Sequence, residues 1–273
     1  MKTNLSSDDV ETTDVNAISK ALRAARASDT PLTEFPGRIP ETLDTAYAIQ
    51  AKSIQAWPDQ VEGWKVGGVP PAFHSKFSER RLAGPIFSKT VRRAPDKGAL
   101  EVPAYQGFVA VEAEWVFELG DCSAIGETDL SMDDVMSAIR AAYIGVELAS
   151  SPIIDINSYG PSVIISDFGN NFGLVIGQRI KDWSSEALSQ VVASVEIDGE
   201  MVGRKAALPG LDGPLGAVKF LIEHLKANGE SDLSGLYVSS GAITGVHDSK
   251  IGASSTVTFE GIGEIDLEIV PIA

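Results

Sequence analysis

Hydrophobic and polar residues alternate over residues 109–119, VAVEAEWVFEL, near the middle of the chain. Because successive side chains of a β-strand point to opposite faces, this alternation predicts a strand whose Glu112 and Glu114 project side by side from one face. The opposite face is apolar and consists of Val111, Ala113, Trp115 and Phe117. Two carboxylates this close repel each other unless a cation, a proton or water separates them. The pair therefore predicts either a solvated acidic strand face or part of a cation site.

Apolar residues spaced three to four positions apart predict two helices before residue 60. The first covers residues 14–27, and its apolar positions are Val15, Ile18, Leu22 and Ala25. The second covers residues 43–57, and its apolar stripe consists of Leu43, Tyr47, Ala51, Ile54 and Trp57. A connector rich in proline and threonine, residues 28–42, separates the two. We therefore expect residues 1–60 to form an N-terminal helical region.

From residue 61 onward, short β-like runs and glycines dominate the sequence. The segment 192–203, VASVEIDGEMVG, has two β-like runs around Asp198-Gly199, which predicts a hairpin. A further helix is predicted from Pro214 to about Gly229, since proline favours the first helical position and glycine the C-terminal cap. Helices and β-runs together predict an α+β fold, with residues 61–273 as a second, β-rich unit.

Composition limits the possible functions. The 273 residues are 44% hydrophobic and 22% charged, as in ordinary globular proteins. A net charge of −16 argues against nucleic acid as a partner, because phosphate binding needs a basic surface. One cysteine, no apolar signal segment and no apolar run of about 20 residues favour a cytoplasmic protein with no membrane span. The glycine motifs that bind dinucleotides or nucleotide phosphates are missing, so we expect no nucleotide cofactor.

A third carboxylate changes the interpretation of the acidic pair. Glu147 lies in an apolar run between Val146 and Leu148. Burial of a carboxylate is costly unless it is paired or bound to a cation. Together with Glu112 and Glu114, it would form an oxygen-rich site of the kind that suits Mg²⁺ or Mn²⁺.

Two basic residues are further candidates for the site. Lys65 lies in a short β-like run before Gly67-Gly68, and constrained turns of this kind often carry function. His74 lies in FHSKFSERR, which we interpret as a short helix or lid. Each has an ordinary alternative, a surface lysine and a packing histidine.

Seven segments of the chain, in their order, resemble motifs of one family. They are DTAYAIQ (44–50), GWKVG (63–67), LAGPIF (82–87), VEAEWVF (111–117), GVELASSPI (145–153), DGPLGAVKFLIEHLKANGE (212–230) and VSSGAITG (238–245). Each motif alone has low specificity, but their order and spacing resemble the 2-keto-4-pentenoate hydratase / 4-oxalocrotonate decarboxylase group of the fumarylacetoacetate hydrolase (FAH) superfamily.

The resemblance implies a FAH-like mixed β-roll, with residues 61–273 as the catalytic domain. It implies a divalent metal, Mg²⁺ or Mn²⁺, held by Glu112, Glu114 and Glu147, and a 2-oxo acid substrate that chelates this metal. It also implies that Lys65 is the active-site lysine and that Ser240 supplies a hydroxyl at the Ser-Gly turn. By the same resemblance we expect a homodimer or a larger homo-oligomer.

The chain departs from the family where protons are handled. The family's Q-P-D-[FA]-G motif is replaced by residues 80–84, RRLAG, so that Leu82 stands in place of the acid. Either Arg80 or Arg81 could favour a dicarboxylate substrate, and a solvated turn is the equal alternative.

The leading functional prediction is a metal-dependent hydratase that adds water to 2-hydroxydienoic or 2-oxo-enoic acids. One alternative is a C–C hydrolase or 2-oxo acid decarboxylase, in which His74 and Glu79 would activate water. A second alternative is a non-catalytic partner subunit of a decarboxylase–hydratase pair.

Overall fold

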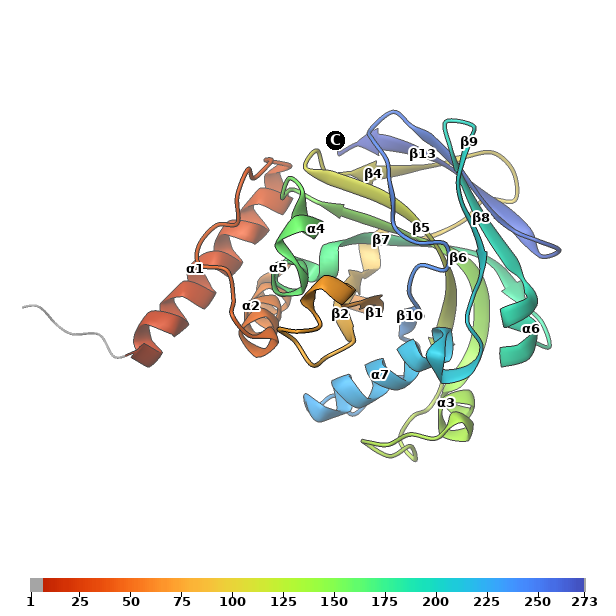
Figure 1. Ribbon diagram of the computed structural model, residues 1–273, viewed down its shortest axis with the longest axis horizontal. Coiled ribbons are helices and arrows are strands. Elements are labelled where there is room, and N and C mark those ends of the chain that lie inside the picture. The colour runs from red at the N-terminus through yellow and green to blue at the C-terminus, as the bar shows by residue number, and fades with distance from the viewer. Residues whose placement is uncertain (1–6, 273) are drawn as a thin grey trace, which may run out of the picture.

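Two mixed β-sheets dominate the computed structural model, which describes residues 7–272, with side chains from residue 14 onward (Figure 1). The larger sheet has the order β2 (Arg81–Phe87), β1 (Val61–Gly68), β10 (Tyr237–Ser239), β5 (Phe108–Leu119), β6 (Ile139–Ser151), β7 (Asn171–Ile180) and β3 (Val91–Arg93), and β11 (His247–Asp248) pairs with β5. The smaller sheet has the order β4 (Leu100–Ala104), β13 (Gly263–Pro271), β12 (Ser254–Phe259), β8 (Val192–Ile197) and β9 (Glu200–Ala206).

The helices cover the outside of this β structure, and α1 and α2 lie at the opposite end of the molecule from β9 and β13 (Figure 1). The α-helices are α1 (Ser7–Ser28), α2 (Leu43–Ala56), α3 (Met132–Ala138), α4 (Ile156–Tyr159), α5 (Pro161–Ser166), α6 (Ser185–Gln190) and α7 (Pro214–Ala227). The 3-10 helices are η1 (Pro71–Phe73), η2 (Ser88–Thr90), η3 (Phe168–Asn170) and η4 (Gly210–Asp212). Within the described part of the chain, none of the helices is both long and apolar enough to cross a membrane.

The main core lies against the apolar face of β5. Trp115 and Phe117 are completely buried there, and the Trp115 ring packs on Phe259 of β12 with ring centroids 4.9 Å apart. The alternation predicted for residues 109–119 is therefore confirmed, because one face of β5 contributes to the core. Its other face carries Glu112 and Glu114.

A second apolar cluster joins the N-terminal helices to the sheet. It combines Leu22 of α1, Ile49 of α2, Leu82 of β2 and Ile165 of α5. Helix α2 packs against both α1 and α5, and its buried residues lie on one face. The second helical prediction was right in extent but wrong in its buried face.

The buried residues of α2 are Leu43, Ala46, Ile49, Gln50 and Ser53. Of the predicted stripe only Leu43 is buried, whereas Tyr47 and Ile54 are half-buried and Ala51 is exposed. Gln50 and Ser53 lie on the buried face because both form hydrogen bonds there. Gln50 donates to the carbonyl oxygens of Ala83 and Ile165, at 3.0 and 2.9 Å.

Local sequence patterns explain the ends of several other elements. Ser131 caps α3 and forms a reciprocal capping box with Asp134. The turn between β8 and β9 is Asp198-Gly199, and both residues have the positive φ angles, 51° and 80°, that tight hairpins favour. Pro214 starts α7, and Gly229 follows its C-cap residue Asn228 with a φ of 88°.

Candidate metal centre

Three carboxylates meet on the face of the large sheet opposite the main core. Strands β5 and β6 are antiparallel, and their register places Glu112 directly across from Glu147. Glu114 follows two residues after Glu112 on the same face of β5. One carboxylate oxygen from each residue lies within 4.8 Å of the others. We call these three residues the carboxylate cluster.

The carboxylate cluster is buried, which makes its charge costly. Glu112, Glu114 and Glu147 expose only 5%, 1% and 1% of their surface. Burial and the repulsion of Glu147 raise the pKa of Glu112 to about 8. Burial, followed by repulsion from Glu147 and Glu112, raises the pKa of Glu114 well above its usual value. A divalent cation would relieve this repulsion, and three carboxylates match the ligands preferred by Mg²⁺ and Mn²⁺.

Lys65 of β1 lies beside the cluster. It exposes 6% of its surface, and its Nζ atom is 3.5 Å from Oε2 of Glu147. Burial alone would lower the pKa of Lys65, but the attraction of the three carboxylates raises it above the usual value. One ammonium group cannot balance three ionised carboxylates, so the raised pKa values keep protons on the cluster unless a cation takes their place. The surface alternative for Lys65 is thus wrong.

Two groups at the end of β10 and in the turn after it hold Glu114. Ser239 Oγ donates to Glu114 Oε2 at 2.5 Å, and the backbone N–H of Gly241 donates to the same oxygen at 2.9 Å. Ser240, the predicted site hydroxyl, instead donates to the carbonyl oxygen of Trp115 at 2.7 Å. Ser239 is the side chain of this turn that touches the carboxylate cluster.

The sequence offered a signal for Ser239, but it depended on strand pairing. Strand β10 pairs with both β1 and β5, and Ser239 lies in register with Lys65 on one side and Val116 on the other. Residues in register share a face, so Ser239 faces the cluster and Ser240 faces away.

Asn171, at the start of β7, holds the third carboxylate. Its Nδ2 atom donates to Glu147 Oε1 at 2.9 Å. Its Oδ1 atom is buried and has no hydrogen-bond partner among the described residues. Asp167 does not join the cluster, because it pairs with Arg26 of α1 at 2.6 Å. Of the polar residues at 167–171, Asn171 is thus the one that contacts a carboxylate of the cluster.

The segment between β1 and β2 contributes no titratable group to the cluster. His74 follows η1, and its Nε2 atom lies 2.8 Å from the carbonyl oxygen of Val69 in the same segment. Glu79 accepts from the hydroxyl of Ser78 at 3.2 Å, and across residues 7–272 no hydrogen bond or ion pair joins it to His74. The structure does not bring the predicted His74–Glu79 pair together.

Leu82 and the two arginines occupy different places around the site. Leu82 is 2% exposed and packs beside Lys65: a Cβ atom placed on Gly67 would lie 3.4 Å from Lys65 Nζ and 3.5 Å from Leu82 Cδ1. Arg80 donates to Ser78 O at 2.8 Å and thus closes its own turn. Arg81 donates to Gly213 O at 3.3 Å, next to the start of α7.

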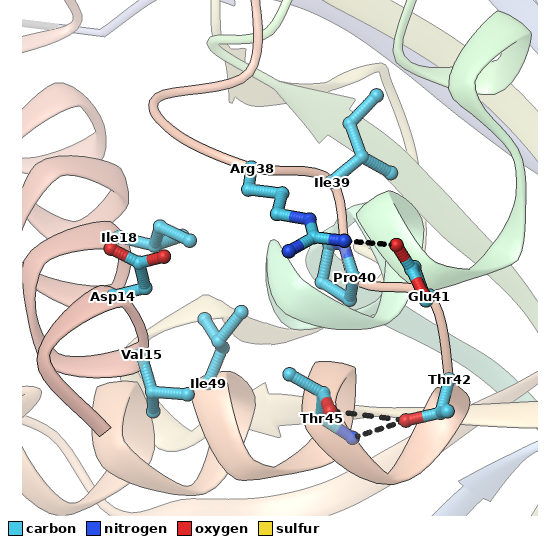
Figure 2. A pocket seen from close by; sticks show the side chains of 10 residues that line it. All are labelled: Asp14, Val15, Ile18, Arg38, Ile39, Pro40, Glu41, Thr42, Thr45 and Ile49. Atoms are coloured by element: carbon cyan, nitrogen blue, oxygen red, sulfur yellow. Dashed lines mark hydrogen bonds and ion pairs between the residues drawn. The ribbon is translucent and has the colours of Figure 1, made fainter. Parts of the chain in front are cut away.

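A surface hollow of about 490 Å³ lies elsewhere, between α1, the connector and α2 (Figure 2). The ion pair of Arg38 and Glu41 lines it, as do the buried side chains of Ile18 and Ile49. None of the six predicted site residues lines it. The candidate chemistry is therefore at the sheet, not in this hollow.

No protein-family model and no curated protein matches the sequence, but solved structures share its fold. One is 4-oxalocrotonate decarboxylase from Pseudomonas putida G7, complexed with magnesium and adipate. It is 20% identical with a TM-score of 0.78, over 95% of this chain and 98% of that chain. The chain has the fumarylacetoacetate hydrolase fold. The predicted α+β class, a FAH-like mixed β-roll with an N-terminal helical region, is thereby confirmed.

Two further structures match a smaller part of the FAH-fold chain. Fumarylpyruvate hydrolase from Pseudomonas aeruginosa, in complex with Mn²⁺ and pyruvate, is 16% identical with a TM-score of 0.52, over 80% of this chain and 94% of that chain. 5-Carboxymethyl-2-hydroxymuconate delta-isomerase from Mycobacterium smegmatis is 17% identical with a TM-score of 0.53, over 79% and 82%. Proteins named for different reactions thus share this fold, so the fold alone does not specify the reaction.

Proposed function

We propose that the protein is a divalent-metal-dependent enzyme that acts on 2-oxo acids. The observation that carries this proposal is the buried carboxylate cluster with Lys65 beside it. Glu112, Glu114 and Glu147 would hold Mg²⁺ or Mn²⁺. When bound, the cation would act as a Lewis acid toward the carboxylate and 2-oxo group of the substrate.

The residues of the chain have separate tasks in this proposal. Ser239 and Gly241 N–H fix Glu114, and Asn171 fixes Glu147, so the carboxylates keep one orientation. Lys65 can hold the substrate by its charge and can move a proton at Nζ. Leu82, beside the same glycine as Nζ, offers no group that could exchange a proton with Lys65.

Among the possible reactions, decarboxylation of an unsaturated 2-oxo dioic acid is supported best. In that reaction the bond to the departing carboxyl carbon breaks, its electron pair moves into the conjugated 2-oxo group, and the product takes up one proton. This needs one proton donor, Lys65, and no activated water. The match to 4-oxalocrotonate decarboxylase over nearly the full length of both chains supports the same choice.

Hydration, the reaction predicted from the sequence, is the second candidate. Addition of water needs a group that positions or deprotonates the water. The family's acid for proton handling is replaced by Leu82, and the charged groups acting on Lys65 are the three carboxylates that would bind the metal. The site therefore lacks an evident group to activate water, which hydration needs and loss of CO₂ does not.

The experiment is a panel of 2-oxo acids assayed with Mg²⁺ and with Mn²⁺, with products identified by ¹³C NMR. We expect CO₂ release from an unsaturated 2-oxo dioic acid and its loss when a chelator is added. Formation of a 4-hydroxy-2-oxo acid instead would support the hydratase. Ligand binding with no turnover on any member would favour the partner-subunit alternative.

The hydrolase alternative has its own test on an acylpyruvate substrate. A hydrolase that uses His74 to activate water should lose most of its activity in His74→Ala. On whichever 2-oxo acid of the panel is turned over, we expect the activity of His74→Ala to stay within about 2-fold of the wild type and that of Lys65→Ala to fall about 100-fold. Of these two residues, Lys65 is the one beside the carboxylate cluster.

A further inference from the structure

A buried arginine links the N-terminal helix to the region of the carboxylate cluster. Arg26 of α1 exposes 5% of its surface. Its Nε and Nη2 atoms donate to the two carboxylate oxygens of Asp167, at 2.6 and 2.9 Å. The guanidinium also lies over the rings of Tyr105 and Phe168, with Cζ 5.1 Å from each centroid. The surroundings suit an arginine in three ways: a carboxylate balances its charge, its planar N–H groups are hydrogen-bonded, and aromatic rings pack on it.

Arg26 donates hydrogen bonds to the residues on both sides of a strained turn, residues 168–170. Phe168, Gly169 and Asn170 all have positive φ angles, 56°, 67° and 63°. A left-handed conformation costs free energy for residues other than glycine, so two of these three need outside support. Arg26 holds the residue before the turn through the carbonyl oxygen of Asp167 at 2.9 Å. It holds the residue after the turn through the carbonyl oxygen of Asn171, also at 2.9 Å.

The same turn contacts two groups of the candidate centre. Asn171, at its end, donates to Glu147 Oε1 at 2.9 Å. Gly169 packs closely on β2 and on the lysine: a Cβ atom placed there would lie 2.7 Å from Gly84 Cα and 3.3 Å from Lys65 Cδ. A change in the turn would therefore move a metal ligand and the proposed proton donor together.

We propose that Arg26 is a positioning residue of the metal centre, acting through the turn at residues 167–171. The inference rests on the proposed function, since it assigns Arg26 a task at that same site. Arg26 neutralises Asp167 and holds the turn in its left-handed form. The turn then fixes Asn171 against Glu147 and packs Gly169 against Lys65. The N-terminal helix thus contributes to the site through Arg26, whose own hydrogen bonds go to Asp167, Asn171 and Ser150 and not to the carboxylates of the cluster.

The test compares Mn²⁺ binding by Arg26→Gln with that of a matched control on the same helix. Ser19 is 2% exposed and accepts a hydrogen bond from Ser53 Oγ at 2.9 Å, so Ser19→Ala also removes a buried polar contact of α1. We expect Arg26→Gln to weaken Mn²⁺ binding about 10–100-fold, the usual range for residues that orient metal ligands. Ser19→Ala should bind Mn²⁺ as the wild type does, even where its thermal midpoint falls.

Arg26→Gln leaves the Asp167 charge buried, so a second variant guards against failure to fold. The double variant Arg26→Gln with Asp167→Asn removes both charges and should show the same loss of Mn²⁺ affinity in a folded protein. Asn171→Ala should also weaken Mn²⁺ binding. Adding Arg26→Gln to Asn171→Ala should lower the Mn²⁺ affinity little further, because both residues act through Glu147.

Two outcomes would overturn the inference, and they are distinguishable. If the folded Arg26 variants bind Mn²⁺ as tightly as the wild type, Arg26 has only a structural role and the proposed function is unaffected. If the wild type itself does not bind Mn²⁺, the proposed function fails and this inference fails with it. Mn²⁺ affinity is measured by calorimetry or electron paramagnetic resonance, so neither outcome depends on knowing the substrate.

Discussion

The carboxylate cluster stands on β5 and β6, the two longest strands of the large sheet, whereas His74 lies in the segment between β1 and β2. In the strands, backbone pairing fixes the positions of Glu112 and Glu147 across one ladder. In the segment, most side chains between residues 71 and 80 are exposed, and His74 bonds back to the segment itself.

The difference indicates which half of the site tolerates change. A side chain on a central strand cannot move without disturbing the ladder, so the carboxylates are pre-organised. A residue in a connecting segment can be replaced at small cost to the fold. Leu82, where the family has an acid, lies just at the boundary between segment and strand. We therefore expect substitutions in the carboxylate cluster to be tolerated less well than substitutions in the segment between β1 and β2.

The largest effect should come from the carboxylate half. Glu114→Gln keeps the shape of the side chain but removes one of the three charges, so metal-dependent turnover should be abolished. Loss of a residue that merely orients a ligand costs about 10–100-fold, and loss of a ligand should exceed that. Turnover and Mn²⁺ affinity are measured together, and undiminished activity would contradict the proposed function.

Lys65→Met, in strand β1, tests the proton-transfer side of the site. We expect turnover to fall about 100-fold, within the range for loss of a general acid. Mn²⁺ affinity should stay equal or increase, because a positive charge next to Glu147 is removed. A parallel loss of Mn²⁺ affinity would show that the two halves are not separable in this way.

The neighbouring serines offer a smaller and more local comparison. Ser239→Ala removes the hydrogen bond to Glu114 and should weaken Mn²⁺ binding about 10-fold. Ser240→Ala removes a bond to the Trp115 carbonyl and should mainly lower the thermal midpoint. If Ser240→Ala has the larger effect on Mn²⁺ affinity, the assignment of the two hydroxyls must be exchanged.

The smallest effect concerns stability against pH in the metal-free protein. The pKa of Glu112 is raised from 4.5 to about 8 in the folded state, so the folded protein binds more protons than the unfolded one between these values. Stability from this group is fully present below pH 4.5 and is lost as the pH rises through about 8.

The corresponding measurement is the thermal midpoint with a chelator present, followed from pH 5 to 9. The midpoint should fall by a few degrees as the pH rises, and saturating Mg²⁺ should remove most of the fall, because the metal binds the deprotonated carboxylates. Glu112→Gln, which cannot titrate, is the control and should show a flatter profile. A midpoint that rises with pH in the chelated wild type would contradict the raised pKa.

Much of the site was visible in the sequence because its signals are local. The parity of β5 places Glu112 and Glu114 on one face, and Glu147 is conspicuous as an acid in an apolar run. The turn at Asp198-Gly199 and the helix from Pro214 have equally local causes. The ordered motifs then indicated a fold that the comparison with solved structures confirmed.

Other features depend on contacts between residues far apart in the chain. The buried face of α2 was mispredicted because α1 and α5 bury Gln50 and Ser53 against partners that no helical periodicity shows. Ser239 was missed in favour of Ser240 because only the register of β10 with β1 and β5 decides which serine faces the carboxylates.

The sequence by itself thus determined the carboxylates, the strand that carries two of them and the class of fold. Those properties follow from the alternation of side chains, from turn chemistry and from the cost of burying charge, all of which act over a few residues. The tertiary structure alone decided what surrounds the carboxylates: Lys65 beside Glu147, Asn171 behind it, and Arg26 brought 141 residues along the chain to Asp167. Each of these pairings exists because packing joins distant segments, and no local pattern records it.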